Sequence, residues 1–115
     1  MSSRDWDFRI QDILQAIDKI ERFLKKMTFQ QFKQNELVID AVLRNLEIIG
    51  EASKGIPVSV KRLHRDIPWA QMAGMRDILI HKYFGVDLKV VWLTVKKSLP
   101  ELRKHLIQLS ALKIK

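Results

Sequence analysis

The 115-residue sequence contains no cysteine, and this absence removes several kinds of chemistry at once. Disulfides, thiolate zinc sites and cysteine nucleophiles are excluded, and a cysteine-free chain suits a reducing cytoplasm. No apolar run approaches the roughly 18 residues of a membrane span, and the first residues lack the apolar stretch of a secretory signal. We therefore expect a cytoplasmic protein with no membrane association.

The sequence also lacks the motifs of metal-dependent and nucleotide-hydrolysing enzymes. It has no HExxH motif, no carboxylate cluster and no glycine-rich phosphate loop, so we expect neither a metal ion nor a cofactor. Its charge is the feature in excess: 21 lysines and arginines stand against 13 acidic residues, a net charge of +8. A basic domain attracts the phosphates of nucleic acids, but many basic proteins bind no nucleic acid. The net charge alone therefore does not show whether this protein binds nucleic acid.

Three prolines and four glycines leave room for long helices, and the apolar pattern predicts them. Apolar residues recur at steps of three and four between charged ones from Asp5 to Lys26, which is typical of an amphipathic helix. Capping signals and prolines divide the rest. They predict a short turn after Thr28 and a helix from Asn35 to Lys54, followed by a linker over 56–67 with a turn at 58–63. A further helix is expected to start near Pro68, and another to run from Asp87 to Lys97. A capping box at Ser98 and Glu101 predicts a last helix that ends at about Ile114. No strand-like alternation occurs, so the fold expected is all-α: an up-and-down bundle of about four to five helices, in a single domain over residues 1–115.

The candidate catalytic residues are Arg76 and His81, with Tyr83 two positions further on. Arginine offers a fork of donors that suits phosphate, and histidine exchanges a proton near neutral pH. Without other information, such a pair is more often a salt-bridged arginine and a packed histidine. Residues five apart on a helix also differ by about 140° in direction, so the two side chains cannot share one face of a continuous helix. Either the helix breaks and turns His81 back, or two copies of the chain bring their motifs together.

A stripe of charged residues on the preceding helix is the second candidate feature. Asp40, Arg44, Glu47 and Glu51 lie at i, i+4, i+7 and i+11, on one helix face. The stripe is either a solvated ladder of ion pairs or a polar groove that supports the catalytic side chains. The three tryptophans, in contrast, are expected to anchor the core or a dimer interface rather than to stack on bases: Trp6, Trp69 and Trp92.

The spacing R-x4-H-x-Y resembles the signature of the HEPN superfamily, and in particular of its HepT-like ribonuclease toxins. The likeness covers about residues 41–102. It is carried by the segments Arg44–Ala52, Asp66–Trp69, Met72–Asp77 and Tyr83–Asp87, with Trp92 after them.

This resemblance implies a HEPN-like bundle that acts as a homodimeric, metal-independent endoribonuclease, with its motifs in a cleft between the two copies. It also implies the toxin of a type VII toxin–antitoxin system, whose partner is an MntA-type nucleotidyltransferase antitoxin. That partner would attach AMP to Tyr83 and silence the nuclease. Two alternatives are a non-catalytic helical adaptor or nucleotide-binding partner of a minimal nucleotidyltransferase, and a basic helical dimer with structural duties only.

Overall fold

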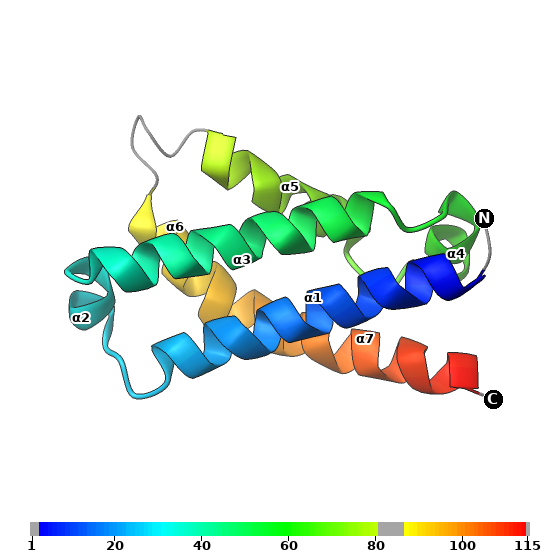
Figure 1. Cartoon of the computed structure of the whole chain (residues 1–115), viewed down its shortest axis with the longest axis horizontal. Coiled ribbons are helices and arrows are strands. Elements are labelled where there is room, and N and C mark those ends of the chain that lie inside the picture. The colour runs from blue at the N-terminus through cyan, green and yellow to red at the C-terminus, as the bar shows by residue number, and fades with distance from the viewer. Residues whose placement is uncertain (1–2, 81–86, 115) are drawn as a thin grey trace.

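The computed structural model describes the backbone of residues 3–80 and 87–114, and the side chains of residues 6–76 and 87–110. Within these ranges every regular element is a helix. In chain order they are α1 (Ser3–Leu24), α2 (Phe29–Lys33), α3 (Glu36–Lys54), α4 (Val58–Leu63), α5 (Trp69–Ile80), α6 (Leu88–Leu93), the π-helical segment η2 (Thr94–Ser98) and α7 (Leu99–Ile114) (Figure 1). The long elements run back and forth along a body of 44 × 28 × 20 Å, which confirms the predicted all-α, up-and-down bundle.

The helix boundaries follow from local side-chain chemistry. The Thr28 hydroxyl and the Gln31 side chain form the predicted capping box, and the Asn35 side chain accepts a hydrogen bond from the Val38 N–H at the start of α3. The first helix ends two residues earlier than predicted, because Lys26 has a φ of 67°, in the left-handed region where an α-helix cannot continue. Neither Asp66 nor Ile67 caps α5, since Pro68 immediately precedes its first residue.

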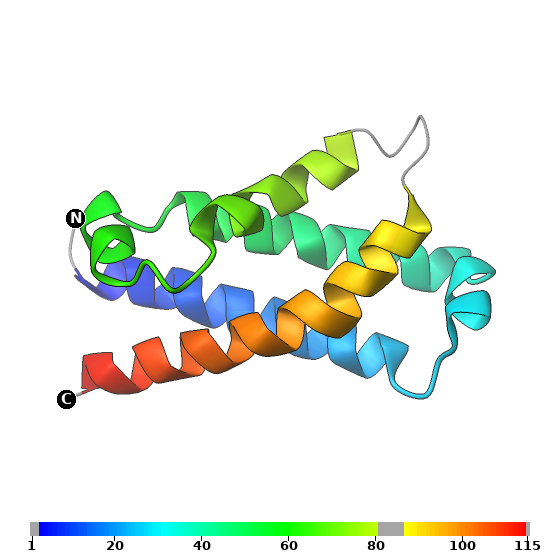
Figure 2. The same ribbon diagram turned by 180° about the vertical axis from the view of Figure 1, so that it is seen from behind.

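Helix α7 begins at Leu99, next to the predicted start at Ser98, but Ser98 lies inside the helical segment η2 and does not cap α7. Residues 88–114 form one continuous rod, in which η2 joins α6 to α7 (Figure 2). Pro100 has no N–H to donate, and the Leu99 N–H reaches back five residues to the Thr94 carbonyl. This wider turn keeps Val91, Val95 and Leu99 buried at steps of four, where a regular α-helix would rotate them away by about 40° per step.

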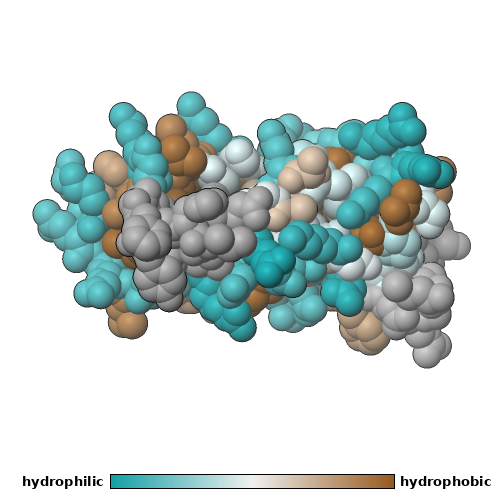
Figure 3. All heavy atoms as spheres, turned by 90° about the horizontal axis from the view of Figure 1, so that it is seen from above, coloured by the Kyte–Doolittle hydropathy of each residue, from teal (hydrophilic) through white to brown (hydrophobic). Residues whose placement is uncertain are grey.

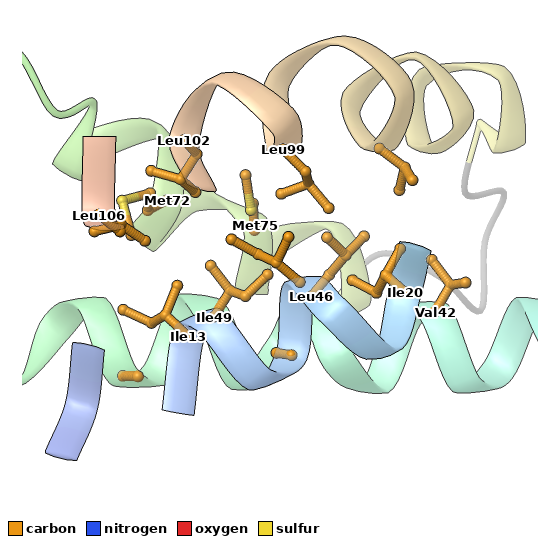
Figure 4. Close-up of a cluster of buried hydrophobic side chains, with 14 of the residues drawn as sticks. Ile13, Ile20, Val42, Leu46, Ile49, Met72, Met75, Leu99, Leu102 and Leu106 are labelled. Atoms are coloured by element: carbon orange, nitrogen blue, oxygen red, sulfur yellow. The ribbon is translucent and has the colours of Figure 1, made fainter. Parts of the chain in front are cut away.

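The core lies between α1, α3, α5 and the α6–α7 rod. Helix α3 packs against α1 on one side and α5 on the other, and α7 packs against α1. Figure 4 shows apolar side chains from these helices pointing toward one another: Ile13, Ile20, Val42, Leu46, Ile49, Met72, Met75, Leu99, Leu102 and Leu106. The packing of α5 against α3 fixes the position of Arg76, which lies in the second half of α5.

Candidate active site at the interface of α3 and α5

A glycine in the middle of α3 brings α5 close to it at the position of Arg76. A Cβ atom on Gly50 would lie 2.8 Å from both the Cβ and the backbone nitrogen of Arg76, and 3.3 Å from the carbonyl oxygen of Ala73. Glycine inside a helix costs about 0.5–1 kcal/mol relative to alanine. Glycine at position 50 therefore makes α3 itself less stable, but it allows the backbones of α3 and α5 to approach closely at Arg76.

Residue Glu51, next to Gly50, holds the Arg76 side chain. Its Oε1 lies 2.6 Å from the Arg76 Nε, and this ion pair joins α3 to α5. Both side chains are about half exposed, at 54% and 41%, so the pair contributes at most about 0.2–1 kcal/mol to stability. The main effect of the ion pair is to set the direction in which the Arg76 side chain points. Among the described residues, Glu51 is the one ion-pair partner of Arg76, and none of them pairs with its terminal Nη1 and Nη2.

The rest of the predicted stripe does not reach Arg76. The Arg44 Nη1 lies 2.5 Å from the Glu47 Oε1 within α3, and Asp40 is exposed. The structure thus brings only Glu51 from the stripe to the candidate catalytic arginine. Gly50 was missed by the sequence reasoning, although a glycine inside an otherwise strong helix pattern is a signal of close backbone approach.

His81 and Tyr83 lie outside the described residues, so the predicted 140° offset between Arg76 and His81 stays a prediction. Within the described part of the chain, no group of three or more His, Asp or Glu side chains is placed to hold a metal ion. None of the described helices combines the length and apolar character that crossing a bilayer requires.

Of the tryptophans, Trp69 is buried, whereas Trp6 and Trp92 are only partly buried against the core.

The close approach at Gly50 gives a stability prediction with a matched control. Gly50→Ala is expected to lower the free energy of unfolding by about 1–3 kcal/mol, because the new methyl group meets backbone atoms of α5. Gly74→Ala, also inside a helix, is expected to raise it by about 0.5–1 kcal/mol, because nothing lies within 4 Å of its Cβ. Urea unfolding followed by circular dichroism measures both. Stabilisation by both substitutions would contradict the contact between Gly50 and Arg76.

Comparisons with known proteins agree on one family. The family model described as "Ribonuclease HepT-like" matches residues 13–109. The chain is 53% identical to the "Probable ribonuclease HepT" of Thermococcus cleftensis over 94 residues, which span 82% of this chain and 86% of that protein. It is also 45% identical over 105 residues to two proteins of Methanocaldococcus jannaschii, each named "Putative RNase", across 91% of this chain and 87% and 90% of theirs.

No solved structure matches the chain well enough to count as a relative. The family match spans most of the chain and includes both helices that build the Arg76 site. The chain therefore belongs to the HepT-like ribonuclease family of the HEPN superfamily.

Proposed function

We propose that this protein is a metal-independent endoribonuclease, with Arg76 and His81 as its catalytic residues. The observation that carries the proposal is the arginine held by Glu51 over Gly50, in a chain whose relatives are named as ribonucleases. An arginine oriented through Nε presents Nη1 and Nη2 together, in the geometry that suits two oxygens of one phosphate. In the adaptor and structural alternatives the same ion pair would serve only to hold α5 on α3.

RNA supplies its own nucleophile, the 2′-hydroxyl, so the protein needs only to move protons and to stabilise charge. In the proposed reaction the 2′-oxygen bonds to the adjacent phosphorus while the bond from phosphorus to the 5′-oxygen breaks. His81 takes the 2′ proton in its neutral form while water protonates the leaving 5′-oxygen, or it gives a proton to that oxygen in its protonated form while water takes the 2′ proton. Arg76 neutralises the charge that builds on the phosphoryl oxygens. The products are a 2′,3′-cyclic phosphate and a 5′-hydroxyl.

The assembly proposed is a homodimer whose cleft gathers the motifs of both copies. This proposal rests on helix geometry, because about 140° separates positions 76 and 81 on a regular helix. A two-fold axis lets Arg76 of one copy act beside His81 of the other. Arg44 and Glu47 lie one to two turns from Glu51 on the same face of α3, and we propose that they line the cleft.

Mixing two inactive variants tests the nuclease and the shared site together. Arg76→Ala and His81→Ala homodimers are each expected to be inactive, but refolding an equal mixture should restore about a quarter of the wild-type activity, since half of the dimers then contain one complete site. Cleavage of a labelled RNA and the solution mass measure this. Full wild-type activity from a species of one 13.5 kDa chain would contradict the shared site, and no wild-type cleavage at all would contradict the nuclease.

The biological role proposed is that of a toxin in a type VII toxin–antitoxin system. Its partner would be an MntA-type nucleotidyltransferase that transfers AMP from ATP to the Tyr83 hydroxyl, with release of pyrophosphate. The added phosphate and nucleoside would lie two positions from His81 in the sequence, where RNA must approach. Negative charge there repels the substrate phosphate, and bulk blocks it.

A further inference from the structure

Two aromatic rings lie together on the surface at one end of the bundle. Phe29 of α2 and Trp92 of α6 are both partly buried, with ring centroids 5.8 Å apart and planes tilted by 58°. Behind them, Phe32 is fully buried and lies 5.5 Å from Trp92. The buried Phe32 fixes the Trp92 ring from below. Phe29 and Trp92 thus form a supported pair of rings that still reaches the surface.

A lysine lies over each of these two rings. The Lys33 Nζ is 5.8 Å from the centroid of Phe29, and the Lys96 Nζ is 4.7 Å from the centroid of Trp92. Both lysines are exposed. The attraction between an exposed ammonium and a ring is weaker than the stacking of a base on an aromatic side chain. A base can therefore displace either ammonium from its ring, and the lysine then meets the phosphate of the same nucleotide.

Helices α2 and α6, which carry the ring pair, lie at the end of the bundle toward which α5 runs (Figures 1 and 2). From above, both hydrophobic and hydrophilic side chains reach the surface at this end of the molecule (Figure 3). A substrate bound at Arg76 can therefore extend toward the helices that carry the rings.

Charge separates this surface from the outer face of α3. Helix α3 carries four acidic side chains and two basic ones, whereas residues 88–110 carry five basic side chains and one acidic one. The α2 segment adds Lys33 and no acid. Electrostatics therefore favours the approach of a polyanion to the junction of α2 with α6.

We propose that Phe29, Trp92, Lys33 and Lys96 form a stacking platform for single-stranded RNA, which binds the unpaired nucleotides beside the cleaved phosphodiester. The alternation of rings and lysines is the arrangement that binds single strands with little sequence preference: bases stack on the rings and phosphates meet the ammonium groups. The platform rests on the proposed nuclease function for its role, but its affinity for RNA can be measured separately.

The test uses an RNA oligonucleotide in which every 2′-hydroxyl is replaced by 2′-O-methyl, so that it binds without being cleaved. The double variant Lys33→Ala/Lys96→Ala is expected to bind it roughly tenfold more weakly, and the slope of log K against log salt should fall by about 1.4, the value for two lost phosphate contacts on a single strand. The matched control is Lys54→Ala/Lys61→Ala, which removes the same charge at the other end of the bundle and should change the affinity less than about twofold.

Ultraviolet crosslinking adds a measurement that does not depend on the net charge of the protein. The oligonucleotide should crosslink to the peptides that contain Phe29 or Trp92, and the double lysine variant should lose most of this signal. Equal weakening by both double variants, or crosslinks confined to other peptides, would overturn the platform. Loss of cleavage in Arg76→Ala with oligonucleotide binding intact would leave both proposals standing. A wild-type protein that binds the oligonucleotide on the platform and cleaves no RNA would overturn the nuclease alone.

Discussion

Arg76→Ala is expected to lower RNA cleavage in excess EDTA by about 10²- to 10³-fold, because it removes the donors that meet the phosphoryl oxygens as charge develops. His81→Ala is expected to cost about 10²- to 10⁴-fold through the lost proton transfer. The side chain of Arg76 is about 41% exposed, so its removal should leave the fold intact by circular dichroism. A rate measured under single-turnover conditions, with enzyme in excess over RNA, reports the chemical step. Unchanged cleavage by both variants would contradict the assignment of Arg76 and His81 as the catalytic residues.

The ion pair adds a graded version of the same test. Glu51→Gln keeps the shape of the side chain but removes the charge that holds Arg76 Nε, so we expect roughly a tenfold loss in rate with little change in stability. Glu101→Gln, at an exposed position on α7, removes the same charge and should leave the rate unchanged. An equal effect of the two substitutions would show that net charge, rather than the orientation of Arg76, sets the rate.

The second large effect concerns Tyr83. Co-expression with its nucleotidyltransferase partner is expected to abolish nuclease activity and to add AMP-sized increments to the intact mass, on the peptide that contains Tyr83. Inhibition should persist at high salt, because bulk near His81 blocks the substrate even where the charge is screened.

Tyr83→Phe separates the modification from catalysis. It is expected to keep about half or more of the wild-type rate, because the phenol serves neither as acid nor as base in the proposed reaction. It should also escape silencing by the enzymatic activity of the partner. Neutralised toxicity with no AMP increment on the Tyr83 peptide would instead point to inhibition by tight binding.

Local chemistry made most of the helices predictable. The step of three and four in α1 and the caps at Thr28, Asn35 and Asp87 depend on neighbouring residues alone. The cap predicted at Ser98 failed for the opposite reason, although α7 begins at the next residue. Its capping signals are local, but Val95 and Leu99 must both face the core, and a π turn within a continuous rod satisfies that demand.

The individual residues of the site could be predicted from the sequence, but their arrangement in space could not. Arg76 and Glu51 were both candidates in the sequence, yet their pairing depends on how α5 packs against α3, which no local pattern encodes. Gly50 makes that packing possible, and its only sequence signal is its place inside a strong helix. Trp92 was expected in the core or at an interface, and its partial exposure beside Phe29 became visible only with the packing of α2 on α6.

The chemical ends of the RNA fragments made in excess EDTA test the central claim most directly. Attack by the 2′-hydroxyl predicts a 2′,3′-cyclic phosphate on the upstream fragment and a 5′-hydroxyl on the downstream one, both readable by mass spectrometry. It also predicts that a single 2′-deoxy nucleotide at the cleaved position stops cleavage there. Fragments with 5′-phosphate ends, or cleavage that stops in EDTA and returns with magnesium, would contradict the proposed role of Arg76 and His81 as a metal-independent ribonuclease site.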